Sequence, residues 1–278
     1  MTEHETPRSW FITGASSGVG RAVAAAALAR GDRVAAAARK PDAVADLAEH
    51  FPGQALAVEL DVHDEQAAQL AVARTVEAFG RIDVVVNSAG YGVLGAVEAT
   101  TDAQARAIFD TNVFGVLNVL RAVLPVLRGQ RAGHVLQVSS NLGQLAMPGT
   151  GMLAATKHAL SGLTEALAAE LSPLGVRFTL LEPGAIATPF LARVVLAHPM
   201  PDYEQTAGAM VKQLGQLPAE ALTDPDRIAA AVLAAADAPE PPLRLALGAA
   251  SADSIRTALT TRLRELDAWS PITRAVDG

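Results

Sequence analysis

The sequence predicts an α/β fold, with one domain at residues 9–278 built on a doubly wound parallel sheet of about seven strands. Short apolar runs alternate along the chain with longer segments of helical period, as is typical of parallel βαβ units. The runs are apolar almost throughout, which suits strands that helices cover on both faces. The 278 residues, 50% hydrophobic and 18% charged, are enough to bury one large core. Residues 1–8 are polar, and we expect them to form a flexible N-terminus.

The predicted elements follow one another in a regular order. Strands are predicted at residues 10–13, 33–38, 55–60, 82–87, 134–139, 176–181 and 243–247. Helices are predicted at residues 19–29, 41–50, 64–79, 101–128, 152–171 and 224–236. Prolines interrupt residues 184–220, which we expect to be a mobile, partly helical, substrate-binding segment. The tail from Trp269 has too little pattern to assign.

Charge and composition exclude several classes of function. There are 29 acidic and 22 basic residues, a net charge of −7, so we expect neither nucleic acid nor a membrane as a partner. The absence of cysteine rules out disulfides, thiolate metal sites and cysteine nucleophiles. The six histidines lack ligand spacing, so we expect no metal site. With no apolar stretch typical of a signal peptide, we expect a cytoplasmic protein.

The first predicted strand runs into a glycine-rich turn that opens a helix. Gly14 permits a tight turn, Gly18 allows backbone N–H groups to approach a pyrophosphate, and Gly20 allows close packing of helix and strand. The helix N-terminus adds unpaired donors and a partial positive charge. An ordinary βα turn is the alternative, but the strand–turn–helix context favours a dinucleotide site.

Further motifs follow this turn in order along the chain. They are Asp61-Val62, Asn87-Ser88-Ala89-Gly90, Asn112, Ser139-Ser140, Thr156-Lys157 and Pro183-Gly184 with Thr188. In this series, over roughly residues 9–190, the sequence resembles the classical short-chain dehydrogenase/reductase family. The resemblance implies a Rossmann-type fold, a nicotinamide cofactor and a homotetramer or homodimer.

The resemblance also implies which residues form the site. Cofactor binding is expected from Gly14, Ser16, Ser17, Gly18, Val19, Gly20, Asp61, Val62, Asn87, Ala89, Gly90, Lys157, Pro183, Gly184 and Thr188. Catalysis in the family uses an asparagine, a serine, a tyrosine and a lysine, and the first, second and fourth of these match Asn112, Ser140 and Lys157.

The end of the second strand bears on the choice of cofactor. It reads Ala38-Arg39-Lys40, with no acid to pair with a ribose 2′-hydroxyl or to repel a 2′-phosphate. Arg39 can meet that phosphate with a charge-assisted fork. We therefore expect NADP(H), although a solvated loop charge would give Arg39 the same sequence context.

Leu153 stands where the family's tyrosine is expected, four residues before Lys157. In the family this phenol passes a proton to a substrate oxygen while hydride moves to carbon, and the lysine lowers its pKa. The interval from Ser140 leads to the same position, and neither Tyr91 nor Tyr203 replaces it by helical position. The family's proton donor is therefore missing.

This departure leaves three interpretations open. The site is a slow or substrate-assisted reductase, in which Ser140 polarises an oxyanion and a water held by Lys157 and Asn112 supplies the proton. Alternatively, it is repurposed for another reaction, or the leucine is an engineered substitution.

We expect an NADP(H)-dependent oxidoreductase that reduces a carbonyl or related unsaturated group of an apolar small molecule. A redox-silent cyclase or isomerase with NADP(H) as structural cofactor, and a non-catalytic NADP(H)-binding module, are the alternatives. We expect the helices at residues 101–128 and 152–171 to build the homo-oligomer. The predicted substrate wall, for which helix packing or a subunit contact is the alternative, contains Leu145, Met147, Met152, Leu153, Val93, Leu94, Phe190, Leu191 and Val194.

Overall fold

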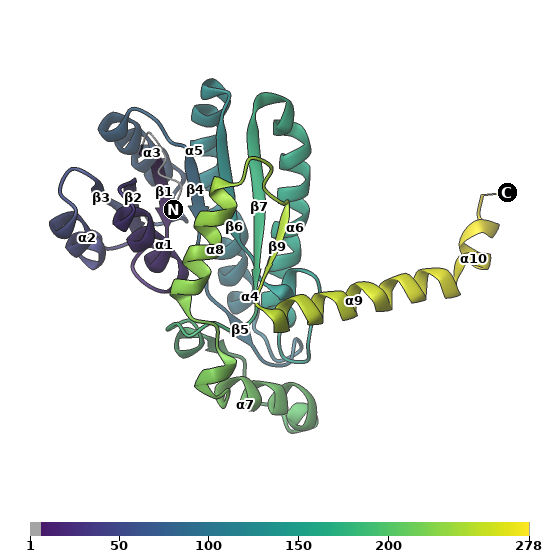
Figure 1. Cartoon of the computed structure of the whole chain (residues 1–278). Coiled ribbons are helices and arrows are strands. Elements are labelled where there is room, and N and C mark those ends of the chain that lie inside the picture. Colours follow the sequence, from purple (N-terminus) through teal and green to yellow (C-terminus); the bar gives the residue numbers. More distant parts are fainter. Residues whose placement is uncertain (1–6, 278) are drawn as a thin grey trace.

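The structure is a computed structural model that describes residues 7–277, and it confirms the seven-stranded parallel sheet (Figure 1). The strand order is β3-β2-β1-β4-β6-β7-β9. The bounds are β1 Ser9–Thr13, β2 Arg33–Ala38, β3 Ala55–Glu59, β4 Val84–Asn87, β6 Gly133–Val138, β7 Val176–Pro183 and β9 Arg244–Leu247. The strand order reverses between β1 and β4, so their carboxyl ends open the crevice in which such sheets bind ligands. The predicted flexible N-terminus, residues 1–8, lies mostly outside the described residues.

Helices cover both faces of the sheet and enclose two apolar cores. On one face, α1 (Gly18–Ala29) packs beside α8 (Pro225–Asp237). The other face carries α3 (Glu65–Phe79), α5 (Gly115–Gln130) and α6 (Gly151–Leu171). Beyond β2, a 3-10 turn at Pro41–Val44 leads into α2 (Ala45–His50). The apolar strands are thus buried on both sides, which explains why they lack alternation in the sequence.

The helix predicted at residues 101–128 is one continuous helix, Asp102–Gln130, with a π turn inside it. It consists of α4 (Asp102–Phe109), the π turn Asp110–Phe114 and α5. By length and hydropathy alone it could cross a membrane, but Val116, Leu120, Val123 and Leu127 are buried in the second core. Its apolar stripe is that of a core helix.

The segment predicted to bind substrate is more ordered than its prolines suggest. It contains β8 (Val195–Leu196), which pairs in parallel with β5 (Val93–Leu94), and α7 (Ala209–Gly215). Two-residue strands carry no periodicity, so the sequence could not reveal them.

The C-terminal residues form an arm that leaves the body of the molecule (Figure 1). It consists of α9 (Ala249–Ala268) and α10 (Ser270–Ala275), neither of which the sequence analysis assigned. The start of α9 packs on the body through the buried Ser251 and Ile255, and Arg262 makes a further hydrogen bond to the body.

Candidate active site

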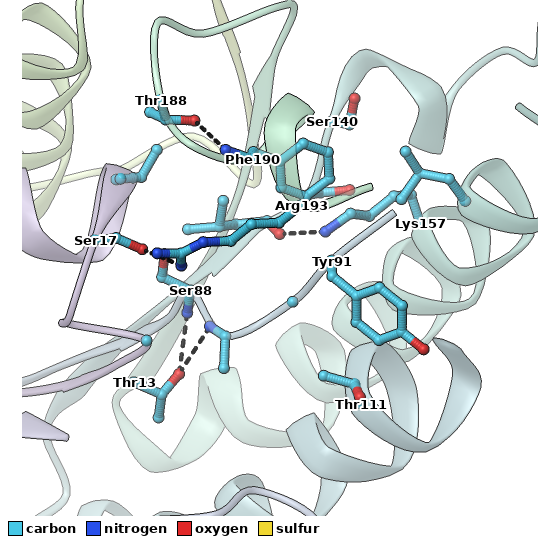
Figure 2. A pocket seen from close by; sticks show the side chains of 18 of the residues that line it. Thr13, Ser17, Ser88, Tyr91, Thr111, Ser140, Lys157, Thr188, Phe190 and Arg193 are labelled. Atoms are coloured by element: carbon cyan, nitrogen blue, oxygen red, sulfur yellow. Dashed lines mark hydrogen bonds between the residues drawn. The ribbon is translucent and has the colours of Figure 1, made fainter. Parts of the chain in front are cut away.

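A cavity of about 990 Å³ lies at the carboxyl ends of the strands, where β1 and β4 part. One end is formed by the glycine-rich turn and the ends of β2 and β3, the other by apolar side chains from α6 and from the segment after β7. A single cavity therefore joins a candidate cofactor cleft to a candidate substrate pocket, as Figure 2 shows from close by.

The glycine-rich turn has the geometry that a pyrophosphate requires. Gly14 has φ +65°, and a Cβ there would lie 2.9 Å from the backbone N of Ala89. A Cβ on Gly20 would lie 2.7 Å from the carbonyl oxygen of Gly14, so this glycine lets α1 approach β1. The N-cap Ser17 makes no side-chain cap, and the first turn of α1 has no acidic residue. Its N–H donors and positive dipole end therefore face the cavity without an anionic partner.

Thr13 holds the second cofactor loop against the glycine-rich turn. Its Oγ1 accepts hydrogen bonds from the backbone N–H groups of Ser88 and Ala89, at 3.1 and 3.2 Å (Figure 2). Ala89 and Gly90 consequently line the cavity. Asn87 is buried behind them, and its side-chain atoms have no hydrogen-bond partner within the described chain.

Arg39 lines the far end of the cavity and is exposed, with Asp61 and Val62 beside it on the cavity wall. His63 lies 3.2 Å from Asp61 through Nδ1 and bonds Thr111 Oγ1 at 2.8 Å through Nε2. These contacts shape the part of the cleft expected to hold an adenosine. This part of the cleft is also lined by His63, Thr111, Phe114 and Asn118, none of which was predicted from the sequence.

Lys157 is the buried cation of the site. Its Nζ donates to the carbonyl oxygen of Val138 at 2.8 Å, and burial lowers the pKa of the ammonium to about 8. The Ser140 hydroxyl lines the same cavity as the lysine, and it accepts from the N–H of Leu142 and donates to Asn141 Oδ1 at 3.0 Å. Leu153 lines the same cavity one helical turn before Lys157 and is 6% exposed. The cavity therefore contains the Lys157 ammonium and the Ser140 hydroxyl, and a hydrocarbon side chain, Leu153, stands where the family has its tyrosine.

Asn112 lies behind the cavity wall rather than on it. Its side chain accepts from the N–H of Tyr91 at 3.1 Å and donates to the carbonyl of Tyr91 at 2.9 Å and to Thr156 Oγ1 at 3.2 Å. A Cβ on Gly90 would lie 3.0 Å from its Oδ1. The π turn thus places an amide that fastens the loop after β4 to α6, a positional use of such turns.

The structure gathers most of the predicted wall into one apolar cluster. The predicted wall residues in this cluster are Val93, Leu94, Leu145, Met147, Met152, Leu153, Phe190 and Val194. The remaining one, Leu191, lines the cavity. Leu214 on α7 and Tyr91 also line the cavity and were not predicted. Leu214 is distant in sequence, and only the fold of the 184–220 segment brings it there.

The cavity collects most of the predicted site residues. The predicted residues that line it are Gly14, Ser16, Ser17, Gly18, Val19, Arg39, Asp61, Val62, Ala89, Gly90, Ser140, Leu153, Lys157, Pro183, Gly184 and Thr188. Gly20, Asn87 and Asn112 stand behind it as supports. Among residues 7–277 no group of three histidines or acids could hold a metal ion.

Comparison with known proteins identifies the family. A model described as short chain dehydrogenase matches residues 9–198. The chain belongs to the short-chain dehydrogenase family. A relative, oxidoreductase BOA17 of Botryotinia fuckeliana, is 39% identical over 92% of this chain and 97% of its own. A 3-ketodihydrosphingosine reductase of Bacteroides thetaiotaomicron is 32% identical over 87% of this chain and 88% of its own.

Solved short-chain dehydrogenases share the architecture. One from Streptomyces avermitilis matches with a TM-score of 0.91 at 38% identity, covering 98% of this chain and 100% of that one. A Burkholderia phymatum protein in complex with NAD gives 0.80 at 26% identity, covering 92% and 94%. A Burkholderia cenocepacia protein in complex with NADP gives 0.74 at 27% identity, covering 94% and 96%. This short-chain dehydrogenase therefore has relatives that bind either nicotinamide nucleotide.

Proposed function

We propose that the chain is an NADP(H)-dependent oxidoreductase that reduces a carbonyl, or a related unsaturated group, of an apolar small molecule with altered proton transfer. The observation that carries the proposal is the single cavity that joins the anion-binding end of α1 to an apolar pocket beside Lys157 and Ser140. Bound NADPH would supply the hydride. The similarity to a 3-ketodihydrosphingosine reductase supports a keto group as the site of reduction.

The choice of NADP(H) over NAD(H) rests on Arg39. Its side chain lines the cleft at the end of β2, where Ala38 leaves no acid to repel a 2′-phosphate. We expect tighter binding of NADPH than of NADH in titrations followed by nicotinamide fluorescence. Equal affinities, or an Arg39→Ala variant with undiminished NADPH affinity, would overturn this assignment.

The residues of the site divide the remaining work. Lys157 carries a charge close to neutral pH, because its pKa is about 8, and can orient a ribose or hold a water. The Ser140 hydroxyl can polarise a substrate oxygen. Leu153, in the position of the family's tyrosine, has no proton to give, so the proton comes from water or from the substrate. Single-turnover oxidation of NADPH with a panel of apolar ketones tests this function.

Leu153 also favours a second candidate, a redox-silent cyclase or isomerase in which NADP(H) forms one wall of the pocket. Product formation without consumption of NADPH would support this candidate against the reductase. Binding of NADPH without any product would support the remaining alternative, a non-catalytic binding module.

We further propose a cytoplasmic homotetramer or homodimer built through the helix at residues 102–130 and α6. Light scattering at micromolar protein tests the assembly, and the mass of a 28.7 kDa monomer would contradict it.

A further inference from the structure

Arg193 bridges the mouth of the cofactor cleft from the segment that follows β7. It ends the 3-10 turn Leu191–Arg193 and lies 176 residues after Ser17 in the sequence. Its guanidinium Nη1 donates to Ser17 Oγ at 3.0 Å (Figure 2). On the same segment, the Thr188 side chain would lie 3.5 Å from a Cβ on Gly18. The segment therefore closes over the glycine-rich turn at two points.

The electrostatics of this contact favour an anionic ligand. Ser17 is the N-cap of α1, where the helix presents a partial positive charge and unpaired N–H donors. A guanidinium placed at that end adds a second positive charge, and an anion bound next to both would relieve the repulsion between them. Within residues 7–277 no carboxylate pairs with Arg193, and its hydrogen bond goes to a neutral hydroxyl.

We propose that Arg193 is an anion clamp that binds the pyrophosphate of the nicotinamide nucleotide and holds the segment at residues 184–193 over it. This inference rests on the proposed function, because it concerns the same cofactor. It differs from the role of Arg39, which lines the cleft at the end of β2, where a ribose 2′-phosphate is expected. One arginine then recognises a group common to both nucleotides, and the other recognises a group present in only one.

Three ligands separate the two roles in equilibrium titrations. NADPH carries both the pyrophosphate and the 2′-phosphate, NADH carries only the pyrophosphate, and adenosine 2′-monophosphate carries only the 2′-phosphate. We expect Arg193→Ala to raise the Kd of NADPH and NADH alike, by about 5- to 30-fold, since a charged hydrogen bond to an exposed guanidinium is partly screened. Its Kd for adenosine 2′-monophosphate stays within about 2-fold of the value for the unmodified chain, because this ligand has no phosphate at the pyrophosphate position.

The variant Arg39→Ala gives the opposite pattern, with a loss of affinity for NADPH and for adenosine 2′-monophosphate but not for NADH. Arg256→Ala is the matched control, because Arg256 is an exposed arginine paired with Asp253 on α9, and the substitution removes the same charge outside the cavity. We expect the control to leave all three affinities unchanged. Raising the salt concentration to about 1 M shrinks the Arg193→Ala effect, since the contact is exposed.

The outcomes distinguish this inference from the proposed function. If the unmodified chain binds neither nucleotide, the proposed function fails and the clamp fails with it. If the unmodified chain binds NADPH while Arg193→Ala binds it equally well, the clamp alone is refuted. A loss confined to NADPH also refutes it, because Arg193 would then recognise the 2′-phosphate.

The C-terminal arm carries a second, independent inference. The start of α9 is anchored, because Ser251 Oγ donates to the carbonyl of Glu182 at 2.7 Å and Ile255 is 9% exposed. Arg262 also reaches back to the carbonyl of Gln144. Beyond that contact the apolar residues are open to solvent. Leu263, Leu266, Trp269, Ile272 and Val276 are 60–81% exposed.

These residues continue a stripe that begins in the core. Ile255, Leu259, Leu263 and Leu266 follow at intervals of four, four and three, which places them on one helical face. In proteins most of the stability of a helix comes from packing of its apolar face rather than from helix propensity. The stripe therefore requires a partner surface.

We infer that this arm, residues 259–277, docks on a second copy of the chain. Residues 259–277 contain three arginines and three acidic residues, so the arm is neutral. A membrane-binding helix is instead rich in Lys and Arg on its polar face. At roughly 100 Å² for each exposed apolar side chain of the arm, a symmetric pair buries on the order of 1,200 Å², which a stable interface requires. At 98% coverage, the similarity to the Streptomyces avermitilis structure extends into the arm.

Light scattering tests the arm. We expect the unmodified chain to have a mass above 28.7 kDa, the mass of one chain. The double variant Leu263→Asp/Leu266→Asp should have half the mass of the unmodified assembly or less. Leu70→Asp is the control, since Leu70 is 60% exposed on α3, and it should keep the full mass. Circular dichroism should show all three chains folded. A monomeric unmodified chain, or an unchanged mass in the double variant, refutes the inference.

Discussion

Replacing Leu153 by tyrosine tests whether the site lacks only a proton donor. Leu153 lines the cavity on the same face of α6 as Lys157, four residues away, with Ser140 also on the wall. In Leu153→Tyr, a phenol would therefore lie near an ammonium that lowers its pKa and a hydroxyl that orients the substrate oxygen. We expect carbonyl reduction to rise.

The size of the gain follows from two opposing effects. General-acid catalysis contributes about 10²–10⁴-fold to a rate, which sets the expected increase in single-turnover NADPH oxidation. Overpacking in a filled core costs about 1–3 kcal/mol. Leu153 is packed among Val93, Leu94 and Leu142 but also faces a cavity of about 990 Å³, so the added atoms can extend into that space. The loss of folding stability should therefore be small, and the gain in rate should be measurable in a folded variant.

The assay compares both forms with apolar ketones and includes product analysis without cofactor consumption. Met152→Tyr is the matched control, because it adds the same phenol about 100° around the helix and should not raise the rate. Cofactor affinity must be equal in all forms, since overpacking would otherwise imitate a catalytic loss. A gain in Leu153→Tyr that survives Lys157→Met would refute the assigned role of the lysine. A fall in turnover on the natural substrate would refute the idea of a reductase lacking only its acid.

Three further predictions concern stability. Burial lowers the pKa of His134 to about 4, so as pH falls from about 6.5 to 4 the unfolded chain binds a proton that the folded chain does not, and the free energy of unfolding drops by on the order of 3 kcal/mol. Urea titrations should show that the free energy of unfolding depends less on pH in His134→Gln than in the unmodified chain. An equal pH dependence in the two chains would contradict the lowered pKa of His134. The lowered pKa of Lys157 makes the free energy of unfolding rise with pH between about 8 and 10.5, relative to Lys157→Met, and a constant difference across that window would count against it. Gly20→Ala places a Cβ 2.7 Å from the carbonyl oxygen of Gly14, so it should destabilise the chain by about 1–3 kcal/mol and weaken NADPH binding, whereas a neutral result would disprove the close approach.

The sheet was predictable because its strands are apolar runs separated by helical periods. Each run, such as Val84–Asn87, is buried on both faces, and that burial is visible in the sequence as continuous hydrophobicity. The order of the strands was not predictable from periodicity, since it depends on how the helices pack on the two faces. The local pattern also did not reveal β5 and β8. These two short strands exist because the connection after β7 returns to pair with the connection after β4.

The predicted site residues also differ in whether their role depends on local sequence or on tertiary contacts. Gly14 was selected for a local reason, the tight turn that it permits, and its φ of +65° agrees with that reason. Asn112 was selected by its motif, but its side chain is committed to Tyr91 and Thr156 behind the wall, and only the three-dimensional structure shows this. Arg193 was not selected, because nothing in its local sequence indicates that it reaches Ser17.

By itself, the sequence determined the α/β class, the glycine-rich turn, the basic end of β2 and the leucine four residues before Lys157. These are properties of short segments, in which periodicity, backbone freedom and charge act locally. The tertiary structure alone decided which side chains share the cavity, which ones stand behind it, and that the apolar stripe of α9 leaves the body. Those features arise from contacts between residues far apart in the chain, and pairing of that kind leaves no periodic trace in a single sequence.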